Sequence, residues 1–144
     1  MKHYSLINVF AVVLLTACAT SNALAVDEDE RGILSTKMVN LSSAVNAYFS
    51  GLPSAPVDND ETILKNATQH DPRLLADEFK PYLLKTQYQN PYAVVLLCSA
   101  DGKQAIMEDA GCSAQLDRQI KDDAPCEFKL HVTKGCEVEG ADPK

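Results

Sequence analysis

Apolar residues recur with a helical period between residues 32 and 49. They are spaced four, three, four and three positions apart: Leu34, Met38, Leu41, Val45 and Tyr48. This spacing lines one face of an α-helix. Asn40, Ser43 and Asn46 fall mainly on the opposite side, as expected for a helix that packs on a hydrophobic core.

The helical pattern stops at residues 51–56, whose sequence GLPSAP is typical of a loop. Asp60 is then expected to cap a second helix that starts at Glu61. Residues 71–83 open with an aspartate followed by a proline, which is a favoured helix start. Pro81 is expected to kink or divide this third helical segment, because proline removes an internal hydrogen bond.

The second half of the chain has a β pattern. Residues 92–98, YAVVLLC, favour a strand covered on both faces, followed by a turn at 99–102 and a second strand over 103–108. Residues 114–121 are ambiguous between a short helix and a loop. Residues 126–133 alternate, which predicts a half-exposed strand whose inward side chains are Cys126, Phe128, Leu130 and Val132.

These elements indicate an α+β fold in which N-terminal helices pack on a small antiparallel β-sheet, mostly a meander. The chain has 144 residues, a length that suits a single domain. We expect the globular domain to span residues 32–136 and a polar tail to follow over 137–144.

The first apolar run, residues 6–15, follows a positive charge at Lys2. It is too short to span a bilayer, which needs about 20 apolar residues, and has the size of the apolar region of an export signal. Ala23 and Ala25 satisfy the small-residue cleavage rule. Cleavage there would remove residues 1–25 and yield a soluble periplasmic or secreted protein.

A second signal overlaps the first. Residues 15–18, Leu-Thr-Ala-Cys, resemble the lipobox of bacterial lipoproteins. This resemblance is confined to residues 1 to about 22, and it implies cleavage after residue 17 and acylation of Cys18, with residues 18–31 as a tether. We favour this interpretation because Cys18 directly follows the apolar run. Either cleavage places the domain outside the cytoplasm. In the lipobox case, the domain lies in the periplasm and is anchored to a membrane.

The four remaining cysteines lie in the last third of the chain: Cys98, Cys112, Cys126 and Cys136. An even number in an exported protein predicts two disulfides. We favour Cys98 with Cys112 and Cys126 with Cys136, because each bridge closes a short loop, while a nested arrangement stays open. The cysteines lack the close spacing typical of zinc sites, so we expect no metal and no other cofactor.

Charge narrows the class of partner. The chain has 20 acidic and 13 basic residues and a net charge of −7. The lysines are scattered along an acidic chain, which argues against binding to nucleic acid or to an anionic membrane surface, because binding to either needs clustered cations. The expected partner is another envelope or periplasmic protein, and a partner with a basic surface would complement the acidic charge of this chain. Membrane contact is expected through the lipid anchor alone.

Catalytic motifs are absent from the sequence, including G-x-S-x-G, H-E-x-x-H and phosphate-binding loops. His131 is expected on the outward face of its strand. Glu108 and Asp109 are adjacent on a predicted strand, where neighbouring side chains point to opposite faces. We therefore assign no catalytic residue and expect a non-enzymatic protein. An unrecognised acidic hydrolase site around these three residues is the alternative.

The leading hypothesis is an envelope protein that binds another protein, as an inhibitor or immunity factor or as an accessory subunit of an envelope machine. A purely structural envelope lipoprotein is a further alternative. The surfaces we expect to contact a partner are the loop 51–60 and the turn 99–102, and their candidate residues are Pro53, Pro56, Asp58, Asp60 and Asp101.

Overall fold

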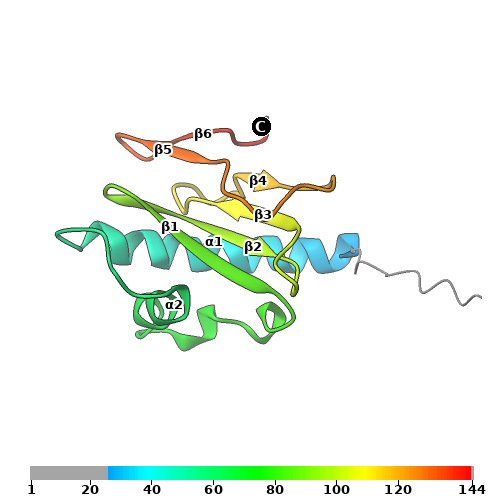
Figure 1. Cartoon of the computed structure of the whole chain (residues 1–144), viewed down its shortest axis with the longest axis horizontal. Coiled ribbons are helices and arrows are strands. Elements are labelled where there is room, and N and C mark those ends of the chain that lie inside the picture. The colour runs from blue at the N-terminus through cyan, green and yellow to red at the C-terminus, as the bar shows by residue number, and fades with distance from the viewer. Residues whose placement is uncertain (1–25, 144) are drawn as a thin grey trace, which may run out of the picture.

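A computed structural model describes residues 26–143 and shows an α+β architecture (Figure 1). The predicted fold class, helices followed by a small antiparallel sheet with two disulfides in the C-terminal part, is confirmed. The lipobox with Cys18 and the alternative cleavage site at residues 23–25 lie outside the described residues. Within residues 26–143, no helix has the length and apolar character needed to cross a membrane.

The first helix, α1, spans Glu28–Ser50. Asp27 caps it by accepting a hydrogen bond from Glu30 N at 2.7 Å, and the acidic first turn suits the positive end of the helix dipole. The predicted apolar stripe is buried, with Phe49 in place of the half-buried Tyr48 at its C-terminal end. Asn46, expected on the solvent side, is instead buried, because it bonds to the strand and the disulfide beneath the helix.

The last residues of the expected tether are part of the fold. Residues 28–31 form the first turn of the helix, and Val26 is buried. Arg31 holds this end of the chain in place, since its guanidinium donates to Val26 O at 3.1 Å and to Ile120 O at 2.9 Å.

The helical segments after α1 are shorter than predicted. The second helix, α2, spans Asp60–Ala67 and is capped by Asn59, which accepts from Thr62 N, so the expected cap at Asp60 is wrong by one residue. The segment 71–83 contains only two 3₁₀ turns, η1 at Pro72–Leu74 and η2 at Asp77–Phe79. The extended backbone of Ala76 separates them.

The main sheet is an antiparallel meander in the order β1-β2-β3-β4. Its strands are β1 at Leu83–Gln89, β2 at Tyr92–Cys98, β3 at Ala105–Asp109 and β4 at Arg118–Gln119. The sequence analysis missed β1 because it assigned Leu83 to the preceding helical segment and found no strand pattern in residues 84–89, which are mostly polar. The strand forms because all seven of its residues pair with β2.

Strand β2 is covered on both faces, as its sequence predicted. Ala93, Val95 and Leu97 pack in the cluster that includes the buried face of α1. Val94, Leu96 and Cys98 pack instead against the C-terminal segment. The protein therefore has three layers: helices, sheet and C-terminal segment (Figure 1).

The C-terminal segment alternates in burial as predicted, but only its end is a strand. Cys126, Leu130 and Val132 are buried, Phe128 is half-buried and His131 is exposed. Strand β5 covers only His131–Thr133 and pairs with β6 at Glu137–Glu139, inside the expected polar tail. The strand cannot start earlier because the backbone N–H groups of residues 129 and 130 bind Glu108 instead.

The disulfides connect Cys98 with Cys126 and Cys112 with Cys136. The favoured pairing and the nested alternative are therefore both wrong. The reason is strand direction: β3 carries the chain from the end of the sheet near Cys98 to the opposite end, where Cys112 follows. A disulfide needs Cα atoms less than about 7 Å apart, and the actual pairs meet this at 5.7 and 5.5 Å.

Candidate functional site

A groove of about 740 Å³ lies beside α1. One wall is the outer side of α1, and the other is the loop of residues 110–116, which joins β3 to β4. We call these the groove and the 110–116 loop. The lining residues are Ser35, Thr36, Val39, Asn40 and Ser43 from the helix and residues 111–116 from the loop.

Two buried aspartates close the 110–116 loop at its neck. Asp109 Oδ1 accepts from Asp117 N at 2.9 Å, and Asp117 Oδ2 accepts from Ala110 N at 2.9 Å. Each carboxylate thus binds the backbone beside the other aspartate, which ties the two ends of the loop together. Both side chains are almost fully buried, where backbone hydrogen bonds are difficult to replace by water.

The loop is also held against α1. The second oxygen of Asp109 accepts hydrogen bonds from Ser42 Oγ on the helix and from Gly111 N. Ser43 Oγ donates to Gly111 O at 3.4 Å. At Gly111 the loop approaches so closely that a Cβ atom would lie 2.4 Å from the Ser42 carbonyl carbon, and its φ is +66°. Only glycine fits this contact without displacement.

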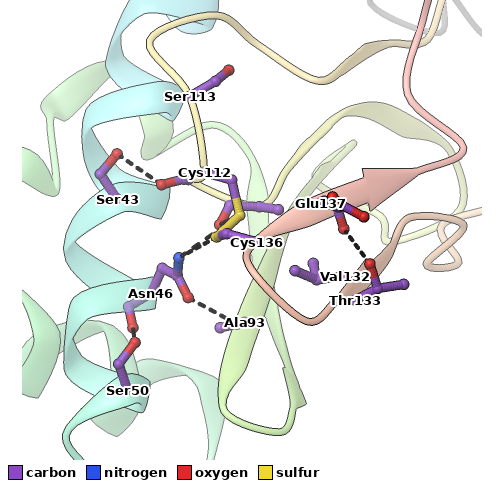
Figure 2. The surroundings of a disulfide bond; sticks show 12 residues. Ser43, Asn46, Ser50, Ala93, Cys112, Ser113, Val132, Thr133, Cys136 and Glu137 are labelled. Atoms are coloured by element: carbon purple, nitrogen blue, oxygen red, sulfur yellow. Dashed lines mark hydrogen bonds between the residues drawn. A yellow bond between two sulfur atoms is a disulfide. The ribbon is translucent and has the colours of Figure 1, made fainter.

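A disulfide ties the loop to the C-terminal segment. Figure 2 shows Cys112 of the loop bonded to Cys136, with Asn46 reaching toward both sulfurs from α1. Asn46 Nδ2 lies 3.4 Å from Cys136 Sγ and 4.0 Å from Cys112 Sγ, and Asn46 Oδ1 accepts from Ala93 N at 3.3 Å. Helix, sheet, loop and C-terminal segment therefore meet at one point beside the groove.

The groove lining is uncharged. It consists of hydroxyl, amide and small apolar side chains, and its single cysteine is oxidised in the disulfide. It therefore presents no side chain that titrates near neutral pH. Such a surface offers hydrogen-bonding and apolar groups to a neutral ligand.

Comparison with known proteins identifies no relative. The chain matches no protein family model, no curated protein and no solved structure.

The residues expected to contact a partner lie away from the groove and from one another. Pro53, Asp58 and Asp101 are exposed, and Pro56 is half-buried. The loop 51–59 follows the C-terminal end of α1, whereas the turn 99–102 lies at the opposite end of the sheet (Figure 1). They do not form one surface.

Two of these aspartates have local structural contacts. Asp60 Oδ1 accepts from Thr86 N at 2.8 Å and from Thr86 Oγ1 at 2.7 Å, so it satisfies the backbone at the free edge of β1. Asp101 accepts from Ser99 Oγ and Lys103 N within its turn, and the Ser99 hydrogen bond is the main cause of its lowered pKa.

The acidic pair considered as a hydrolase site has a different environment from the one assumed. Glu108 and Asp109 are both fully buried, on opposite faces of β3. Glu108 Oε1 accepts from the N–H groups of Lys129 and Leu130, and Oε2 binds Arg118 at 3.1 Å. His131 is exposed and bonds to neither carboxylate. Within residues 26–143, no group of three or more histidines, cysteines or acids is placed to hold a metal ion.

Sequence reasoning missed the 110–116 loop as a site and predicted only that the second strand ends at residue 108. A partial signal was present, since a glycine followed by a cysteine after a strand suggests an anchored turn. The partner of each anchor lies far away in the sequence, at residues 42, 46 and 136, so local patterns do not reveal it.

The buried position of Asp109 predicts an unusual pH dependence of stability. Burial raises the pKa of Asp109 to about 6, against the lowering effect of its hydrogen bonds from Ser42 and Asp117. Because this pKa is higher in the folded than in the unfolded chain, folding favours the protonated acid. We expect the free energy of unfolding to rise by about 1 kcal/mol as the pH falls from about 7 to about 5, as measured by urea unfolding.

Asp109→Asn provides the control for this pH effect. The variant is less stable at every pH, because its amide nitrogen faces backbone donors, but the rise between neutral and mildly acidic pH should disappear. An unchanged slope in Asp109→Asn would assign the pH effect to another group.

Proposed function

We propose that this chain is an exported binding protein of the cell envelope, anchored through Cys18, which holds a segment of a partner protein in the groove. The groove beside α1, with its fixed walls and uncharged lining, is the observation that carries this proposal. Such a protein acts either as an inhibitor of a periplasmic enzyme or as an accessory subunit of an envelope machine.

Two features support the proposed location outside the cytoplasm. The two disulfides are consistent with an oxidising compartment outside the cytoplasm. The apolar run and lipobox-like residues 15–18 favour export and lipid attachment in the periplasm. An intact mass of the mature protein tests the anchor: an acylated N-terminal Cys18 supports it, and an unmodified Val26 contradicts it.

The binding role rests on the fixed walls of the groove. The 110–116 loop is held at its neck by two aspartates, at Gly111 by the helix backbone and at Cys112 by a disulfide. A loop fixed in advance loses little conformational entropy on binding, which favours affinity. Without these anchors, a seven-residue surface loop would be mobile.

The occupant is expected to be an uncharged stretch of polypeptide. Hydroxyl and amide groups such as those of Ser43, Asn40 and Gln115 can pair with backbone N–H and C=O groups, and Val39 and Leu116 offer apolar contacts. The partner's charged groups would then contact the acidic surface outside the groove, where a basic protein is favoured.

Photo-crosslinking in the cells that produce the protein tests the surface. A photoreactive residue at Val39 or Gln115, both in the groove, should capture the same partner. The same residue at Gln87, exposed on β1, should capture none. Capture from Ser54 or Asp101 but from neither groove position would overturn the groove assignment in favour of the loop surfaces, and no capture at any position would overturn the binding role.

Substitution within the groove provides a quantitative prediction. Asn40→Arg places a long, charged side chain on the exposed wall of α1, where it fills the groove and must be desolvated by the partner. We expect affinity for the captured partner to fall by about tenfold or more, with unfolding unchanged. Ser54→Arg adds the same charge on the loop 51–59 and should leave affinity within about twofold.

A further inference from the structure

The two disulfides lie in different environments. Cys98 and Cys126 are buried between β2 and the C-terminal segment, at 0% and 8% exposure. Cys112 and Cys136 are both half-buried, and Cys112 lines the groove. The second bond therefore lies closer to the surface than the first.

Asn46 places a hydrogen-bond donor at this more accessible bond. Its amide oxygen accepts from Ala93 N, which directs its NH₂ group to the sulfurs, 3.4 Å from Cys136 Sγ (Figure 2). A neutral disulfide sulfur is a weak acceptor, whereas a thiolate is a strong one. A fixed N–H donor therefore stabilises Cys136 most when it carries the negative charge of a leaving thiolate.

Cys136 lies in the hairpin turn between β5 and β6 and has an unusual backbone conformation. Its φ is +62°, in the left-handed region that residues other than glycine rarely adopt. The following strand β6 begins directly after it, so the bond and the hairpin together hold this conformation. Partly exposed disulfides are more readily reduced than buried ones.

We propose that Cys112–Cys136 is a redox-active bond that a dithiol reduces selectively, while Cys98–Cys126 is purely structural. A thiolate of the dithiol attacks Cys112 Sγ from the groove, forming a mixed disulfide and releasing Cys136 as a thiolate beside Asn46. The second thiolate of the dithiol then attacks the dithiol sulfur that is bonded to Cys112 in the mixed disulfide, and Cys112 leaves as a thiolate. The dithiol is oxidised to a disulfide, and its two protons end on the protein thiols.

Reduction changes the wall of the groove. The neck at Asp109 and Asp117 and the contact of Gly111 with α1 remain, but the tip of the 110–116 loop loses its bond to the C-terminal segment. If the groove binds a partner as proposed above, reduction weakens that binding. The redox state would then regulate occupancy of the groove.

Partial reduction of the folded, mature protein with dithiothreitol tests the selectivity. Free thiols are alkylated at intervals and located by peptide mass spectrometry. We expect Cys112 and Cys136 to be alkylated at least about tenfold faster than Cys98 and Cys126. Equal rates, or faster labelling of the buried pair, would overturn the proposal.

Asn46→Asp tests the role of the donor. It keeps an oxygen to accept from Ala93 N but replaces the NH₂ group with a second, negatively charged oxygen that opposes a thiolate. We expect the rate for Cys112–Cys136, relative to that for Cys98–Cys126 in the same molecule, to fall about tenfold. Ser50→Ala, one turn from Asn46 on the exposed side of α1 and without a contact to sulfur, should leave the ratio unchanged. An unchanged or higher ratio in Asn46→Asp would refute a positioning role for Asn46.

A binding measurement separates this proposal from the groove proposal. The partner captured by crosslinking is titrated against oxidised and selectively reduced protein. Weaker binding after reduction supports regulation of the groove. Selective reduction with unchanged binding refutes that regulation and leaves the redox assignment in place, whereas failure of Asn40→Arg to weaken binding refutes the groove function independently.

Discussion

Gly111→Ala is expected to lower the free energy of unfolding by about 3 kcal/mol or more, which is large for an added methyl group. The new Cβ would lie within 2.5 Å of three backbone atoms of Ser42 and Ser43, and its residue would have to adopt a φ of +66°. The backbone of α1 cannot yield, because the helix is packed on the sheet along its buried face. The loop must therefore move away and strain the contact between Asp109 and Ser42. Urea unfolding with the disulfides intact measures the loss.

Two other glycines provide matched controls for this substitution. Gly135 has a φ of +82°, and apart from its chain neighbours no residue lies within 4 Å of the place that a Cβ would take, so Gly135→Ala isolates the backbone cost, about 1 kcal/mol. Gly32 lies inside α1 with open space around it, so Gly32→Ala should stabilise the protein by up to about 1 kcal/mol. A loss at Gly111 no larger than that at Gly135 would show that the close contact with α1 is unimportant.

Local sequence predicts the elements of this fold better than it predicts the contacts between them. The apolar stripe of α1 and the continuous run of β2 follow from side-chain periodicity, and both were predicted because each segment buries the face that its own pattern defines. The position of Gly111 after a strand was also readable. Its contact with Ser42 was not, because the two residues are distant in the sequence and no local preference depends on the contact.

Strand β1 and the C-terminal segment illustrate the same limit. Leu83–Gln89 is a strand because β2 pairs with all of it, although much of its own sequence is polar. Residues 126–130 alternate like a strand and bury the expected side chains, yet two of their backbone N–H groups bind a carboxylate. Tertiary contacts override local preference in both cases.

Buried charge was the most difficult feature to predict. A glutamate at the end of a strand is usually exposed, but Glu108 is fully buried between β3 and the C-terminal segment. The Glu108 carboxylate is needed as an acceptor because residues 129 and 130 do not pair in a strand and direct their N–H groups inward. A side chain that the sequence alone would place in solvent thus satisfies the backbone of a segment about 20 residues away.

Glu108→Ala is accordingly expected to destabilise the protein by about 4 kcal/mol. The substitution removes the acceptor shared by Lys129 N at 2.9 Å and Leu130 N at 3.0 Å and leaves Arg118 without its buried partner. It also leaves a void in a layer where Leu130 is fully buried. Urea unfolding measures the loss, and hydrogen exchange at residues 129 and 130 should report it locally.

Glu108→Gln and Arg118→Met separate the contributions of charge and backbone. Glutamine keeps one oxygen for the two N–H groups and loses only the ionic contact, so its cost should be smaller than that of alanine. Arg118 is 22% exposed and binds only the other oxygen, so Arg118→Met should also cost less than Glu108→Ala. Equal losses in all three variants would mean that the ion pair is dominant. The expected order instead makes Glu108 the acceptor that fixes the C-terminal segment on β3, and with it the position of Cys136 beside the groove.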